Sequence, residues 1–92
     1  MQLFVGLDVS QVSTHLCVVD PDGKQAWRGK CSTDPDVLAR TIETSAGSAA
    51  KVGIETGPLT PWLVHTLRAV GLDVACIEAR HAHAVMSAAQ VN

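Results

Sequence analysis

The pattern of hydrophobic and polar positions changes its period once along the chain. In the first third, short β-branched runs predict buried strands at residues 3–9 and 13–20 and a further strand at residues 24–32. The segment Asp20-Pro21-Asp22-Gly23 is a strong turn signal between the last two. These segments predict an antiparallel meander.

Helical and strand signals alternate in the remaining two thirds. Asp34 followed by Pro35 is typical of an N-cap and first helical position, and Gly47 then closes a helix that runs to about residue 46. Residues 51–55 form the next expected strand.

A second cap-and-proline pair, Thr60-Pro61, predicts another helix that ends at Gly71. Its expected core face holds Leu63, Leu67 and Val70. A strand at residues 73–77 and a helix that begins near residue 80 complete the pattern.

The resulting order, β-β-β-α-β-α-β-α, predicts an α/β fold with a mixed sheet, because strands that alternate with helices must pair in parallel. The last helix is followed by no glycine, proline or closing strand. We therefore expect residues 1–92 to be the N-terminal portion of a larger, C-terminally incomplete domain.

Composition narrows the functional classes. The chain of 92 residues is 47% hydrophobic with a formal net charge of −2, which indicates a globular domain without the basic footprint of a free-standing nucleic-acid binder. Aromatic residues make up only 3% of the chain, too few for a base-stacking platform. Most phosphate contacts to any nucleic acid must therefore come from elsewhere.

Cysteine usage and the N-terminus indicate a reducing compartment. Cys17, Cys31 and Cys76 are odd in number and lie within apolar runs, so we expect three buried, reduced thiols. There is no secretory signal and no apolar run of membrane-spanning length, which predicts a cytoplasmic protein.

Two carboxylates stand out, because each follows a glycine by two positions at the end of a β-branched run. Asp8 follows Gly6, and Glu55 follows Gly53. Carboxylates are depleted in strands, and a divalent metal is the usual compensation when two such strands are neighbours. The alternative is structural: Asp8 caps a turn with Ser10 and Glu55 opens a loop. Considered as a pair, they favour a shared metal site.

Other candidates are weaker. The amides of the loop at Gly57-Pro58 could take a phosphate, but a structural connection is favoured. His81 and His83, two residues apart on a helix, point to opposite sides, and His65 reads as a surface or rim residue, so zinc is not favoured.

Cations share one face of the third expected strand: Lys24, Arg28 and Lys30. We interpret them as protection of a solvated edge strand rather than as a phosphate-binding patch.

Three motifs occur in order: GLDVS at residues 6–10, IETGP at 54–58 and IEARHA at 77–82. Together they resemble the N-terminal part of the DEDD-type insertion-sequence transposases, the recombinases guided by a bridge RNA. The resemblance covers the whole chain. It implies a RuvC-like, ribonuclease-H-type fold, DNA transposition as the activity of the full-length protein, and DNA and a bridge RNA as partners of a homo-oligomer without membrane contact.

The resemblance also implies that Asp8 and Glu55 are catalytic and metal-binding, as the first two acids of a four-carboxylate site for Mg²⁺ or Mn²⁺. The other two acids belong to a segment expected beyond Asn92, and a serine nucleophile to a C-terminal domain. The isolated chain is therefore expected to hold the metal weakly and to be inactive. At Gln11 the family commonly has lysine, so that residue's phosphate contact is in doubt here.

Two alternatives remain open. The N-terminal half of an actin-like ATPase or sugar kinase begins with the same meander and an early Asp, although its phosphate loop usually has glycine just after that Asp, where Val9, Ser10 and Gln11 stand here. The other alternative is an inactive, truncated assembly module.

Overall fold

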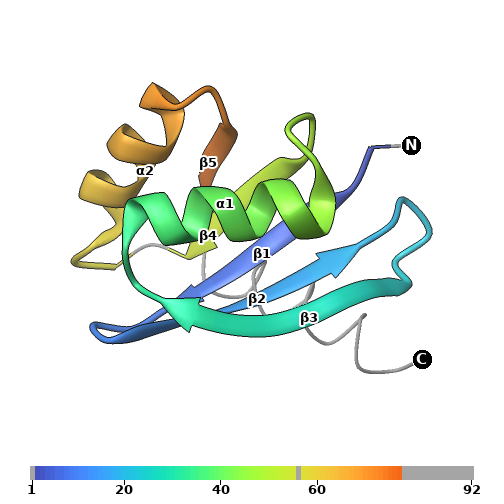
Figure 1. Cartoon of the computed structure of the whole chain (residues 1–92), viewed down its shortest axis with the longest axis horizontal. Helices are drawn as coiled ribbons and strands as arrows, with labels where there is room; N and C mark the ends of the chain where they lie inside the picture. The colour runs from blue at the N-terminus through green and yellow to red at the C-terminus, as the bar shows by residue number, and fades with distance from the viewer. Residues whose placement is uncertain (1, 56, 78–92) are drawn as a thin grey trace.

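A computed structural model describes residues 2–55 and 57–77. The meander consists of β1 (Phe4–Val9), β2 (Ser13–Val19) and β3 (Gln25–Ser32) (Figure 1). It is followed by α1 (Pro35–Ala46), β4 (Lys51–Glu55), α2 (Thr60–Ala69) and β5 (Asp73–Ile77). The predicted order β-β-β-α-β-α-β is therefore confirmed, and the helix expected from residue 80 lies outside the described residues.

The strands form one mixed sheet in the order β3-β2-β1-β4-β5. β2 pairs antiparallel with both β1 and β3, whereas β4 pairs parallel with both β1 and β5. β1 is thus the central strand, and its carboxyl end lies beside the carboxyl end of β4. β3 is an edge strand, as its cations predicted.

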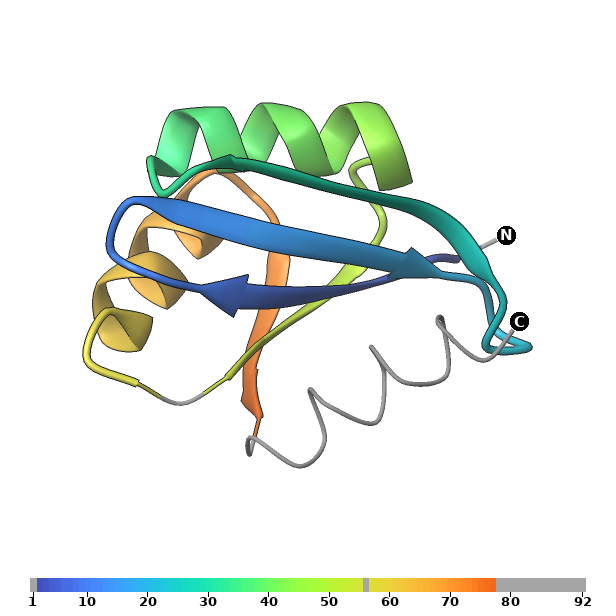
Figure 2. The ribbon, with the colours of Figure 1, turned by 90° about the horizontal axis from the view of Figure 1, so that it is seen from below.

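Both described helices pack on the same face of the sheet, as Figure 2 shows, and the main core lies between them and the strands. Val5 and Leu7 point into this core from β1, with exposed fractions of 2% and 1%. Because side chains alternate along a strand, Gly6 and Asp8 belong to the opposite face. We call that opposite side of the sheet the open face, since neither α1 nor α2 covers it, although Cys17 and Val19 are buried on it and pack with Phe4.

Local signals explain why the elements begin and end where they do. The side chain of Asp34 caps α1 by accepting hydrogen bonds from the amides of Asp36 and Val37 at 2.9 and 3.2 Å. Gly47 ends the helix with a φ of 87°, a conformation that favours glycine. Predicted and observed bounds of this helix coincide.

The second helix departs from the prediction at both ends. Thr60 is its first helical residue, not its cap: Leu59 occupies the cap position and makes no side-chain hydrogen bond to the helix. The helix ends at Ala69, so Val70 lies after its last residue. The Val70 side chain is 53% exposed instead of facing the core. Leu72, which is 4% exposed, fills the core after the turn at Gly71.

The expectation of three buried thiols is also wrong. All three cysteines are free, but Cys17 is buried, Cys31 is intermediate and Cys76 is exposed. The physical reason is strand position: Cys17 lies on the interior strand β2, whereas Cys31 and Cys76 lie on the edge strands β3 and β5.

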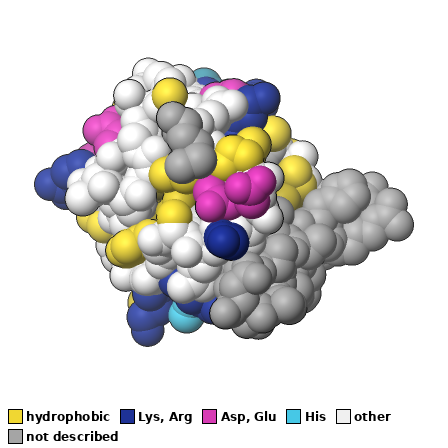
Figure 3. Space-filling view, turned by 90° about the vertical axis from the view of Figure 1, so that its right-hand side faces the viewer, with side chains coloured by type: hydrophobic (Ala, Val, Ile, Leu, Met, Phe, Trp, Pro, Cys, Tyr) yellow, Lys and Arg dark blue, Asp and Glu magenta, His cyan; other side chains and the backbone are white. Residues whose placement is uncertain are grey.

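Charge is dispersed on the side of the molecule shown in Figure 3, where lysine and arginine side chains stand in separate places rather than in one patch. Among the described residues no helix is both long and apolar enough to cross a bilayer.

Candidate metal and nucleic-acid site

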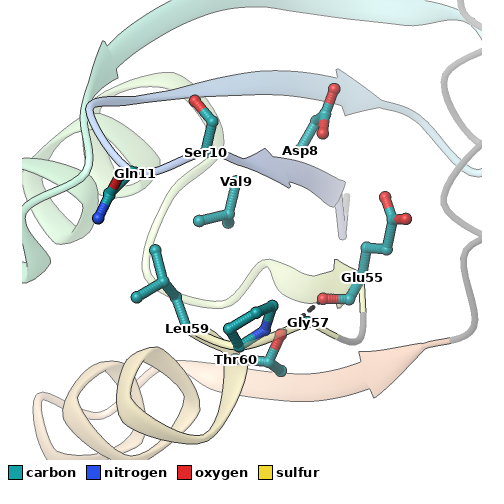
Figure 4. Close-up of a pocket in the computed structure, with 9 residues that line it drawn as sticks. Asp8, Val9, Ser10, Gln11, Glu55, Gly57, Leu59 and Thr60 are labelled. Atoms are coloured by element: carbon teal, nitrogen blue, oxygen red, sulfur yellow. Dashed lines mark hydrogen bonds between the residues drawn. The ribbon is translucent and has the colours of Figure 1, made fainter.

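The register between β1 and β4 brings the two predicted acids together. Gly6 pairs with Gly53 and Leu7 with Ile54 across these parallel strands. Asp8 and Glu55 occupy the next positions on these strands. Both carboxylates therefore lie near the carboxyl ends of adjacent strands. In Figure 4 their side chains project toward the same side of the strands. The two acids therefore lie on adjacent parallel strands.

Both acids line one cleft of about 490 Å³ at this end of the sheet (Figure 4). Asp8 is exposed and Glu55 is half-buried. The remaining lining comes from the loop after β1 and from the loop that leads into α2: Val9, Ser10, Gln11, Gly57, Pro58, Leu59 and Thr60. Open α/β sheets place ligand sites at this edge, beyond the carboxyl ends of their strands.

The wall of the cleft beside Glu55 is fixed by Thr60. Its hydroxyl donates to the carbonyl oxygen of Glu55 at 2.7 Å, and its amide donates to the carbonyl of Gly57 at 3.1 Å. Thr60 is 3% exposed, and its hydroxyl bond to Glu55 is partly buried. The Thr60-Pro61 pair predicted a helix cap, whereas Thr60 is the first residue of α2 and its hydroxyl contacts the backbone of Glu55.

The loop on the Asp8 side is held by hydroxyl groups. The amide and the hydroxyl of Ser10 both donate to the carbonyl of Ser13, at 3.0 and 2.6 Å. Thr33 donates from its hydroxyl to the carbonyl of Ser10 at 2.6 Å and shares a hydrogen bond of 2.8 Å with the buried hydroxyl of Thr14. Since Ser10 and Thr33 make these bonds, the turn does not depend on the Asp8 carboxylate. This observation weighs against the purely structural interpretation of Asp8.

The glycine beneath Glu55 allows a close approach between strands. A Cβ atom at Gly53 would lie 2.9 Å from Cδ1 of Ile77, so the side chain of Ile77 on β5 occupies the space that glycine leaves. The surface beneath Glu55 is therefore filled by a side chain of β5.

The donor set fits a hard divalent cation such as Mg²⁺ or Mn²⁺, which binds carboxylate oxygens and usually keeps several waters. Within the described ranges no three His, Cys, Asp or Glu side chains gather as a metal site. His65 is exposed and lines a different hollow beside α2, which agrees with its predicted rim position. His81 and His83 lie outside the described residues.

Comparison with known proteins agrees with the fold that holds this site. The model of the DEDD-type IS110 family, described as "Transposase", matches residues 5–91. The solved structure of the large terminase nuclease from thermophilic phage G20c, with bound zinc, superposes with a TM-score of 0.65 at 22% identity. That likeness covers 92% of this chain and 52% of the terminase chain, so this chain spans about half the length of that structure. No curated protein matches significantly.

The sheet order and this superposition define the fold as ribonuclease-H-like, as predicted. The chain belongs to the family of DEDD-type IS110 transposases. Family membership favours the transposase over the actin-like ATPase or sugar kinase.

Proposed function

We propose that this chain is the N-terminal portion of a transposase that catalyses DNA transposition at a divalent-metal carboxylate site. Asp8 and Glu55 are the metal ligands that this portion contributes. The proposal rests on one observation above all: the pairing of Gly6 with Gly53, which puts both acids at one end of adjacent parallel strands and in one cleft. The family match supplies the reaction class.

The chemistry follows from charge. A bound Mg²⁺ or Mn²⁺ supplies Lewis-acid stabilisation of charge on the phosphoryl oxygens. Asp8 and Glu55 would hold the metal ion at the carboxyl ends of β1 and β4. The loop residues Ser10 and Gln11 line the cleft on one side. The Thr60 hydroxyl fixes the backbone of Glu55 and so limits where its carboxylate can reach.

The remaining ligands and partners belong to the whole protein. Further acids from beyond residue 92 complete the site in this proposal, and a second domain carries the nucleophilic serine. DNA is the substrate, a bridge RNA is the guide, and a homo-oligomer is the working assembly. The 92-residue chain by itself is then inactive, because its ligand shell is incomplete.

The test is a recombination assay on the full-length protein with Asp8→Asn and Glu55→Gln. Each substitution removes a negative charge while keeping nearly the same shape, so we expect activity to fall by about a hundredfold or more with the melting temperature almost unchanged. Asp73→Asn is the matched control, since Asp73 is an exposed acid at the opposite end of the same sheet.

Full activity in both variants would remove the acids from the mechanism. A wild-type protein that assembles but shows no strand transfer with either Mg²⁺ or Mn²⁺ would instead support the assembly module.

A further inference from the structure

The strand register continues the row that contains the two acids toward the β3 edge. Asp8 pairs with His15 across β1 and β2, and His15 pairs with Lys30 across β2 and β3. Directly opposed residues of antiparallel strands lie on the same face, with Cβ atoms about 5 Å apart. A single transverse row therefore runs from Glu55 through Asp8 and His15 to Lys30.

All of the row lies on the open face. Thr14 and Leu16, which flank His15, are both 0% exposed and point to the helix-covered side, so His15 points the other way. Gly29 and Cys31 flank Lys30 in the same manner, and Cys31 packs against the main core. His15, Lys30 and Asp8 are all exposed.

The row is electrically polarised. Its β4 end holds two carboxylates, whereas its β3 end holds an imidazole and an ammonium group. On the β5 side, the residue opposite Glu55 is Ile77, which offers no charge. Among the described residues of this row, the hydrogen-bond donors for an anion thus lie on the β3 side of the acids.

A nucleic-acid strand that reacts at the acids must also place its neighbouring phosphates somewhere. Bound metal neutralises charge at the reacting phosphate, but phosphates farther along the strand need donors of their own. Lys30 lies about 10 Å from Asp8, two strand spacings of about 4.8 Å. An imidazole donates an N–H in either protonation state, and a lysine ammonium donates three.

From this arrangement we infer that His15 and Lys30 bind backbone phosphates of the DNA strand that occupies the Asp8–Glu55 cleft, on the β3 side of the reacting phosphate. The inference rests on the proposed function and adds the path of the DNA to it. The DNA strand crosses the open face from the acids toward β3. It also revises the interpretation of Lys30 as edge protection only.

The test measures DNA affinity against salt concentration for His15→Ala and Lys30→Gln, each in the full-length protein carrying Glu55→Gln to prevent turnover. We expect each variant to weaken binding roughly fivefold to tenfold at low salt. For Lys30→Gln, the slope of log affinity against log salt should fall by about 0.7–0.9. Lys51→Gln is the matched control, because Lys51 is an exposed lysine of the open face at the far end of β4.

The outcomes separate this inference from the proposed function. DNA affinity and salt slope equal to those of the Glu55→Gln parent would overturn the phosphate contacts while leaving the metal-site proposal standing. Increased self-association of Lys30→Gln with unchanged DNA affinity would likewise return Lys30 to edge protection. Weaker binding of a guide RNA without weaker DNA binding also overturns the inference, and a wild-type protein that binds no DNA at all overturns both proposals.

Discussion

The hydroxyl of Thr60 donates a 2.7 Å hydrogen bond to the carbonyl oxygen of Glu55 and so joins the first residue of α2 to the last residue of β4. The bond closes a loop of the cleft that contains Gly57 and Pro58. Because Thr60 is 3% exposed, water cannot easily replace the hydroxyl as a donor. The position of a candidate metal ligand is thus coupled to the start of a helix.

Replacing Thr60 by valine keeps the shape of the side chain and removes this donor. We expect Thr60→Val to lower the free energy of unfolding by about 1–3 kcal/mol, because the Glu55 carbonyl loses the donor of a partly buried hydrogen bond. Transposition activity should fall further than that stability loss explains. Thr60→Ser, which retains the hydroxyl, is the control in urea melts and in the recombination assay. Equal stability of the valine and serine variants would contradict the coupling.

Thr33 joins the start of α1 to the loop after β1. Its hydroxyl contacts both the carbonyl of Ser10 and the hydroxyl of Thr14, and Thr14 is 0% exposed. Thr33→Val should therefore cost about 1–3 kcal/mol in a urea melt, since a fully buried hydroxyl loses its partner. Thr44→Val, at an exposed position of α1, is the control and should change stability by less than about 0.5 kcal/mol. A Thr33→Val variant as stable as that control would show that the network is dispensable.

Gly29 provides room for the ring of Trp27 on the same strand. A Cβ atom at residue 29 would lie 2.3 Å from Cη2 of Trp27, whose ring packs against the main core. Gly29→Ala should destabilise the fold by about 1–3 kcal/mol through overpacking. In a Trp27→Leu background the same substitution should cost much less, so a double-mutant cycle measured by urea melts tests the contact. Equal cost in both backgrounds would rule out the contact as the reason for glycine.

The thiols should differ in reactivity. Burial raises the pKa of the Cys17 thiol, and the positive charge of Arg28 offsets part of that rise. At neutral pH Cys17 therefore holds less thiolate than an ordinary cysteine, while Cys76 is exposed. Alkylation followed by mass spectrometry should label Cys76 first and Cys17 only on unfolding, and a Cys76→Ser variant should lose the fast phase. Labelling of Cys17 at the rate of Cys76 would contradict the burial.

The sequence determined the elements whose ends depend on neighbouring residues. The bounds of α1, β4 and β5 match their predictions, because a capping carboxylate, a proline or a turn glycine acts within a few residues. The matched glycine-to-acid spacing likewise predicted, from the sequence alone, that Asp8 and Glu55 share one site. It was sufficient because side chains alternate along every strand, so equal spacing from paired glycines preserves the face.

Tertiary structure decided what depends on partners distant along the chain. Whether Val70 or Leu72 enters the core depends on where α2 stops against the sheet, and whether a cysteine is buried depends on whether its strand is interior or an edge. The position of His15 opposite Asp8 depends on the register that the Ser10, Thr14 and Thr33 hydroxyls set in the loop between their strands. A shift of that register by one residue would turn His15 to the other face, and the register depends on the turn geometry and on which face of the sheet the helices bury.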